Sequence, residues 1–129
     1  MDLQLDGKLA LVSGSTAGIG FAIASALARE GARVIVNGRT DRRVKEATER
    51  IRAHNAEAQL EPLPADLGGA AGVEEAIRRF PEVDILVNNL GIFEPTPFEE
   101  ISDADWLRFF EVNVMSGVRL SRAYLPRMK

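Results

Sequence analysis

Short apolar runs alternate along the chain with longer segments in which apolar residues recur at helical spacing. Such runs are typical of strands buried on both faces, which need few polar residues. The predicted strands are residues 9–12, residues 34–36, a strand within 59–65, and residues 85–88. The third contains Pro62 and Pro64, and because proline cannot donate to a sheet ladder, we expect it at an edge. The fourth is almost entirely apolar and is expected to be central.

The segments between and after these strands predict helices with one apolar face each. The inward residues are expected to be Ile19, Ala22, Ile23, Ala26 and Leu27 in the first helix, Val44, Ala47, Thr48 and Ile51 in a second over about 41–55, and Val73, Ala76, Ile77 and Phe80 in a third. A turn is expected at Asn37-Gly38. Ser102, followed three residues later by Asp105, resembles a capping box and predicts the start of a long helix toward Met128.

This alternation predicts an α/β fold, a doubly wound parallel sheet with helices on both faces. No repeat, low-complexity tract or linker divides the sequence, so residues 1–129 are expected to form a single domain. The pattern stops after the fourth strand and its following helix. This leaves the apolar fourth strand as a bare edge of the sheet, so we expect the domain to be incomplete. An incomplete product of a longer protein is favoured over a natural short form whose fourth strand pairs with a partner, because no charged residue or proline protects that edge.

Composition excludes several kinds of chemistry and partner. Lys and Arg number 16 against 19 Asp and Glu, and the net charge of −3 gives no electrostatic footprint for nucleic acid or an anionic membrane. The chain has no cysteine and one histidine, His54, which argues against thiolate or two-histidine metal sites. No apolar run approaches the roughly 18 residues of a membrane span, and the acidic start is unlike a signal peptide. We therefore expect no metal, no membrane and a cytoplasmic protein.

Glycines at 14, 18 and 20 lie between a predicted strand and a predicted helix. In that position glycine permits a sharp turn, close approach of the backbone to a pyrophosphate, and tight packing of helix on strand. The N–H groups that open the helix then face the phosphate charge, and the hydroxyls of Ser15 and Thr16 are additional candidate donors. The alternative is a glycine-rich turn without a ligand. Position and spacing favour the nucleotide, so residues 1–129 are expected to be a Rossmann-like dinucleotide-binding domain.

Four motifs in this order resemble the short-chain dehydrogenase/reductase family. Ser13–Gly20 is similar to its T-G-x-x-x-G-I-G loop, residues 88–91 to its N-N-A-G motif with Leu90 in place of the small residue, Asp66-Leu67 to its adenine-contacting pair, and Asn113 to its helical asparagine. The resemblance implies that the cofactor is bound by Gly14, Ser15, Thr16, Gly18, Ile19, Gly20, Asp66, Leu67, Asn88 and Gly91. It implies a catalytic role for Asn113. Two residues keep a structural alternative: Asp66 as a strand-end cap and Asn88 as a stabiliser of the sheet.

The end of the second strand indicates which nicotinamide cofactor is preferred. Proteins that prefer NAD place a carboxylate there to bind the ribose 2′-hydroxyl. This chain has Asn37-Gly38-Arg39, and the guanidinium of Arg39 suits a 2′-phosphate. The alternative is that Arg39 is a solvated turn residue. We expect NADP(H) to be preferred over NAD(H).

Family enzymes use an Asn–Ser–Tyr–Lys set, of which this chain has only Asn113. Tyr124 is the one tyrosine, but position 128, where Y-x-x-x-K requires lysine, is Met128. Pro126 is also expected to interrupt the helix. Tyr124 is therefore rejected as the acid/base.

The resulting hypothesis is the cofactor-binding half of an NADP(H)-dependent oxidoreductase that acts on a small alcohol or carbonyl substrate. The 129 residues alone are expected to be inactive. The alternative is a non-catalytic nucleotide-binding or assembly module. The resemblance also implies that the complete enzyme is a homo-oligomer.

Overall fold

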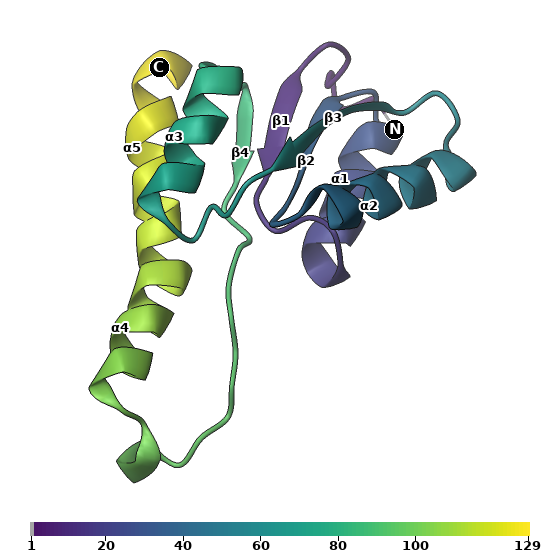
Figure 1. The fold of residues 1–129 in the computed structure, drawn as a ribbon. Coiled ribbons are helices and arrows are strands. Elements are labelled where there is room, and N and C mark those ends of the chain that lie inside the picture. The colour runs from purple at the N-terminus through teal and green to yellow at the C-terminus, as the bar shows by residue number, and fades with distance from the viewer. Residues whose placement is uncertain (1) are drawn as a thin grey trace.

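The computed structural model describes residues 2–129, which form one four-stranded parallel sheet in the order β3-β2-β1-β4 (Figure 1). The strands are β1 (Leu9–Val12), β2 (Arg33–Gly38), β3 (Gln59–Pro64) and β4 (Ile85–Val87). The helices are α1 (Gly18–Arg29), α2 (Asp41–His54), α3 (Ala70–Arg79), α4 (Asp103–Phe110) and α5 (Ser116–Met128), with a 3₁₀ turn at Phe98–Glu100. The predicted Rossmann-like sheet is confirmed.

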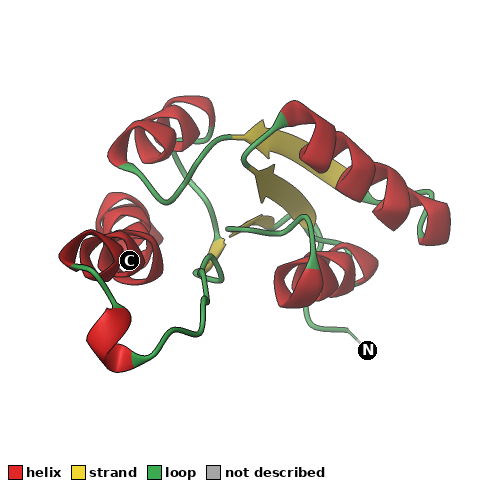
Figure 2. Ribbon diagram, turned by 60° about the horizontal axis from the view of Figure 1, so that its bottom comes forward, coloured by secondary structure: helices red, strands yellow, loops and turns green. Residues whose placement is uncertain are grey.

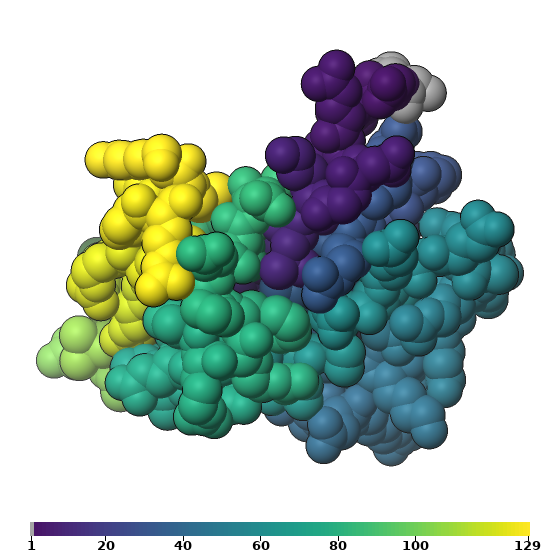
Figure 3. All heavy atoms as spheres, turned by 90° about the horizontal axis from the view of Figure 1, so that it is seen from above, coloured from purple at the N-terminus to yellow at the C-terminus, as the bar shows by residue number. Residues whose placement is uncertain are grey.

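Helices cover both faces of the sheet, as the view in Figure 2 shows. Alternate strand residues point to opposite faces, so Val34 and Val36 pack in the core beneath α1 and α2, while Ile35 packs in the core beneath α3 and α5. Leu11 of β1 joins the second core. Seen from above, the yellow end of α5 lies beside the teal segment that holds α3 (Figure 3). Burial on both faces explains why the strands read as continuous apolar runs.

The buried face of α2 is the predicted one, whereas that of α1 is predicted only in part: Ile23 and Leu27 pack against the core, but Ile19 and Ala22 do not. Val44, Ala47, Thr48 and Ile51 are all buried in α2. In α1 the buried residues are Gly20, Ala24 and Ala28, and Ile19 is 76% exposed. The small residues allow α1 to lie close against the sheet, and this close contact outweighs the larger apolar side chains that set the predicted face.

The sheet edges differ in part from expectation. Within the part of the chain that the structure describes, β3 pairs with β2 alone, which confirms the predicted edge strand. The predicted turn at Asn37-Gly38 is wrong: both residues belong to β2 and pair with Leu63 and Pro64. β4 was expected to be central, but among the described residues it pairs only with β1, and its side chains are half-buried.

One long helical stretch follows β4 after an extended loop (Figure 1). Ser102 caps α4 as predicted, its Oγ accepting a hydrogen bond from the Asp105 N–H at 3.1 Å. A π-helical segment, Glu111–Met115, then joins α4 to α5 and was not predicted. The expected interruption at Pro126 is also wrong, since α5 continues to Met128. The missing proline N–H falls in the final turn, where few later bonds depend on it.

None of the helices within residues 2–129 combines the length and apolarity needed to cross a bilayer.

Candidate cofactor site

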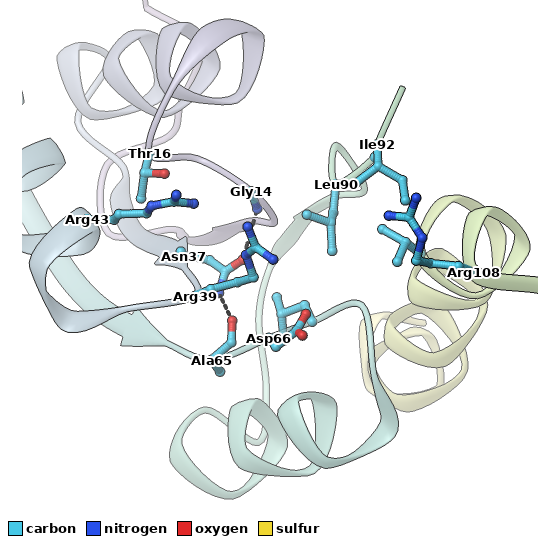
Figure 4. Close-up of a pocket in the computed structure, with 14 residues that line it drawn as sticks. Gly14, Thr16, Asn37, Arg39, Arg43, Ala65, Asp66, Leu90, Ile92 and Arg108 are labelled. Atoms are coloured by element: carbon cyan, nitrogen blue, oxygen red, sulfur yellow. Dashed lines mark hydrogen bonds between the residues drawn. The ribbon is translucent and has the colours of Figure 1, made fainter. Parts of the chain in front are cut away.

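A cavity of about 440 Å³ opens where the carboxyl ends of the parallel strands meet (Figure 4). Ligands of open α/β sheets bind at such a crevice. Its inner wall is Gly14, Thr16, Asn37, Gly38, Arg39 and Arg43; its floor is Ala65, Asp66 and Leu67; its outer wall is Leu90, Gly91, Ile92, Arg108 and Val112. The sequence motifs thus converge on one cavity from four strand ends.

Two glycines of the loop have backbone conformations that other residues rarely adopt. Gly14 has φ +61° and Gly18 φ +59°, left-handed values that disfavour other residues. A Cβ on Gly20 would overlap the Gly14 carbonyl oxygen and the Asn89 side-chain nitrogen. The start of α1 therefore lies directly against the loop, which is the close approach required to expose helix N–H groups to a phosphate.

Asn37 organises the inner wall and was missed as a site residue. Its side chain is 1% exposed. Its Oδ1 accepts from the Gly14 N–H at 2.9 Å, and its Nδ2 donates to the carbonyls of Leu63 at 3.0 Å and Ala65 at 2.9 Å. One amide thus joins the glycine loop to β2 and to the end of β3. The available signal was a polar residue directly after the apolar run of β2, where a buried amide needs partners.

Two serines fix the loop from behind. The Ser15 N–H donates to the Asn37 carbonyl, and the Ser15 Oγ accepts from the Asn37 N–H, both at 2.8 Å. Ser15 is fully buried and does not line the cavity, whereas Thr16 does. Ser13 Oγ accepts from the N–H groups of Asn89 and Leu90 at 3.0 Å, which connects the loop to the end of β4.

The two asparagines after β4 have different contacts. Asn89 Nδ2 donates to the carbonyls of Ser13 and Gly14, each at 3.1 Å. Asn88 points away from the cavity, where its Nδ2 donates to Ser121 Oγ on α5 at 3.1 Å. Gly91 lines the cavity, but Ile19, like Asn88, lies outside its lining residues. Ile19 lies at the exposed start of α1, whereas the Asn88 side chain is directed to α5.

Asp66 and Leu67 lie together on the floor. Asp66 is exposed, and its Oδ1 accepts from the Gly68 N–H at 2.9 Å, which is the capping contact considered as its alternative role. The second carboxylate oxygen makes no hydrogen bond among the described residues. Leu67 is 1% exposed yet contributes to the lining. The floor thus offers an apolar surface beside an acceptor.

Two exposed arginines, Arg39 and Arg43, project into the cavity from the inner wall (Figure 4). Across residues 2–129, neither pairs with a carboxylate. The end of β2 carries no acidic residue, so the inner wall has two guanidinium groups and no carboxylate. Arg43 was missed in the sequence because it lies on α2, four residues after Arg39, rather than in a loop motif.

A family model described as short chain dehydrogenase matches residues 8–129. The chain belongs to the short-chain dehydrogenase family.

Relatives agree in sequence and in structure. The uncharacterized oxidoreductase YvaG of Bacillus subtilis is 57% identical over 128 residues, covering 99% of this chain and 48% of the relative. D-beta-hydroxybutyrate dehydrogenase of Cupriavidus necator is 39% identical over 130 residues, covering 98% and 50%. L-sorbose reductase of Gluconobacter frateurii, solved with NADPH and L-sorbose, superposes with a TM-score of 0.89 at 33% identity, covering 99% and 50%. The chain spans about half the length of these relatives.

In this short-chain dehydrogenase chain, Asn113 lies in the π-helical segment beside the outer wall. Its Oδ1 accepts from the Ile92 N–H at 2.6 Å, and its Nδ2 donates to the Ile92 carbonyl at 3.1 Å. The amide therefore clamps the loop after β4 to the helix. Single π-helical turns occur frequently at functional sites, because they break the regular backbone ladder locally.

Arg108, on α4, was not identified from the sequence. Its Nη2 donates to Glu94 Oε2 at 2.7 Å, and Asp105 Oδ1 lies 3.7 Å away. The hydrogen bond to Glu94 is the main factor that raises the pKa of Arg108. Together, Arg108 and Asn113 hold the outer wall of the short-chain dehydrogenase cavity.

Tyr124 lies far from this cavity in the core between α3 and α5. Its hydroxyl donates to the Phe80 carbonyl at 2.8 Å, and burial raises its pKa to about 12. A phenol with a raised pKa and a fixed partner is unsuited to proton transfer near neutral pH. This agrees with its rejection as the short-chain dehydrogenase acid/base.

Proposed function

We propose that this chain forms the cofactor-binding half of an NADP(H)-dependent oxidoreductase that interconverts an alcohol and a carbonyl compound. The observation that carries the proposal is that the glycine loop and two arginines without a carboxylate partner in residues 2–129 line one cavity. The end of β2, which borders this cavity, has no carboxylate. The NADPH in L-sorbose reductase supports the same cofactor for this chain.

The residues present fit a dinucleotide phosphate. A Cβ at Gly20 would fill the space between the loop and α1, and the donor set consists of helix N–H groups, the Thr16 hydroxyl and guanidinium groups. The loop and the start of α1 would hold the pyrophosphate, and Arg39 the 2′-phosphate. Asp66, Leu67 and Gly91 would hold the adenosine end. When bound, the nicotinamide supplies or accepts a hydride.

Most of the other motif residues would act indirectly. Ser15 and Asn88 would shape the loop and the strand ends, while Gly18 and Ile19, at the start of α1, belong to the part that would hold the pyrophosphate. Asn113 would position the loop at Ile92 and take part in a proton relay to solvent, the catalytic role carried over from the family. With Tyr124 buried, these residues supply no acid/base to the substrate oxygen. We therefore expect the 129-residue chain to bind cofactor without turnover.

Binding of NADPH and NADH to the 129-residue chain tests this function, with Arg39→Asp as the variant. Calorimetry is expected to show tighter binding of NADPH to the wild-type chain. A hydrogen bond to a charged group contributes about 1.5–3 kcal/mol, so Arg39→Asp should lower NADPH affinity by roughly 10- to 100-fold with little effect on NADH. Arg52→Asp, an exposed arginine on α2 outside the cavity, is the control with the same charge change.

Tighter binding of NADH than NADPH, or an unchanged preference in Arg39→Asp, would contradict NADP specificity. Turnover of a panel of alcohols and ketones by the purified chain, free of any longer enzyme, would contradict the expectation that this chain binds cofactor without catalysis.

A further inference from the structure

The outer wall places a guanidinium opposite the cationic inner wall. Arg108 and Val112 are one helical turn apart on the stretch that begins with α4, and both line the cavity together with Ile92. In Figure 4 Arg108 lies across the cavity from Arg39, beside Ile92. The Arg108 side chain is 43% exposed and is held by Glu94, which belongs to the loop after β4. The ion pair thus holds the exposed guanidinium at the rim of the cavity.

The order of groups in a dinucleotide indicates what would reach this rim. If the pyrophosphate lies at the glycine loop and the adenosine ribose at the end of β2, the base extends past Arg39 toward the floor. The floor and the outer wall are close together there: the Val112 methyl Cγ2 is 3.3 Å from where a Cβ on Gly68 would lie. Leu67 and Val112 both line the cavity, so the part where the floor and the outer wall meet is an apolar slot, and Arg108, one helical turn before Val112, lies at its mouth.

We infer that Arg108 is an adenine-binding residue, whose guanidinium packs against the base while Glu94 holds it in position. The inference rests on the proposed function. A planar cation over an aromatic face is attracted to its π electrons, and arginine is suited to stacking because its guanidinium is flat and weakly hydrated. The contact is with the base, so it serves NADP(H) and NAD(H) alike.

Glu94 positions the Arg108 guanidinium for this contact and contributes little to the stability of the fold. An exposed ion pair contributes only about 0–1 kcal/mol to folding. It does, however, connect the loop after β4 to α4 through a charge-assisted hydrogen bond of 2.7 Å. Together with the two Asn113–Ile92 bonds, it fixes the side of the slot that the buried network of Asn37 does not reach.

The test is a comparison of Arg108→Ala with Arg39→Asp in calorimetric titrations of the 129-residue chain. A cation–π contact of about 0.5–2 kcal/mol corresponds to a loss of roughly 2- to 30-fold. Arg108→Ala should weaken NADPH and NADH by the same factor, whereas Arg39→Asp should change their ratio. Adenosine 2′,5′-bisphosphate, which has the base but no nicotinamide, should lose that factor as well.

Two more variants separate shape from charge. Arg108→Lys keeps the charge but not the planar group and should recover only part of the affinity. Glu94→Gln should weaken binding less than Arg108→Ala. The control is Arg127→Ala. Arg127 is an exposed arginine at the C-terminal end of α5 that pairs with Glu82, and its removal should leave all affinities unchanged. Thermal melts should show each variant folded, since all three side chains are exposed.

The outcomes distinguish this inference from the proposed function. No binding of NADPH or NADH by the wild-type chain would overturn both. Binding by the wild-type chain that Arg108→Ala leaves unchanged would overturn the adenine contact alone. A loss confined to NADPH would overturn it too, because it would assign Arg108 to the 2′-phosphate.

Discussion

The inner wall of the cavity is held by buried hydrogen bonds, whereas the outer wall is held by contacts at the surface. Asn37 and Ser15, which fix the glycine loop, are at most 1% exposed. No residue from 91 to 115 is buried, and the contacts of Ile92 and Glu94 to the helix are exposed. Regions with few buried contacts open at lower free energy than the core. The inner wall is thus preformed, and the outer wall is the side that can move.

The largest expected effect comes from Asn37→Ala, which breaks the inner wall. Truncation leaves the Leu63 and Ala65 carbonyls and the Gly14 N–H without their side-chain partner. An unsatisfied buried polar group costs about 1–3 kcal/mol, so we expect the free energy of unfolding to fall by about 3 kcal/mol. Urea denaturation measures this loss. A decrease in the free energy of unfolding of less than about 0.5 kcal/mol would contradict this and indicate that water replaces the amide.

Tyr124→Phe tests the buried end of the helix whose other end forms the outer wall. Loss of the bond to the Phe80 carbonyl should cost about 1 kcal/mol. Burial raises the pKa of Tyr124 from 10.0 to about 12, so its contribution is complete below pH 10. As pH rises from 10 toward 12, the unfolded chain loses this proton first and stability falls. Tyr124→Phe should lack this part of the fall in stability. Equal dependence of the unfolding free energy on pH in the variant and the wild-type chain would contradict the prediction.

Asn113→Ala should have the smallest effect on global stability and a local effect on the outer wall. The two bonds it removes are exposed, so the free energy of unfolding should change by less than about 1 kcal/mol. Hydrogen exchange of the Ile92 amide should accelerate, while the Gly14 amide should keep its protection. Equal acceleration at both amides would show that the two walls open as one unit.

Most of the inner wall and floor could be predicted from the sequence, because glycine spacing and strand ends are local signals. Gly14, Thr16, Arg39 and Asp66 all line the cavity. Asn37 could not be assigned, since its role depends on β3 and the glycine loop meeting around one amide. The Asn37-Gly38 pair resembles a turn in isolation, but pairing with β3 extends the strand through it.

The outer wall was harder to predict. Arg108 is an ordinary exposed helix residue until the loop after β4 brings Glu94 within hydrogen-bond distance. The π-helical segment has no sequence pattern of its own here. Ile19 fits the apolar helical period, yet the close contact of Gly20 with the loop turns α1 so that Ile19 faces out. In each case contacts between distant segments decide the outcome.

The two prolines of β3 limit how the sheet can grow. The Ala65 N–H donates to the Gly38 carbonyl, so by alternation Pro62 and Pro64 present their backbone to the free side, where neither has an N–H to offer. The carbonyl of Pro62 already accepts from Arg79 at 3.1 Å. A further strand, from this polypeptide or another, thus finds no ladder beside β3. Among residues 2–129, β4 pairs only with β1, so a further strand could extend the sheet beside β4 but not beside β3.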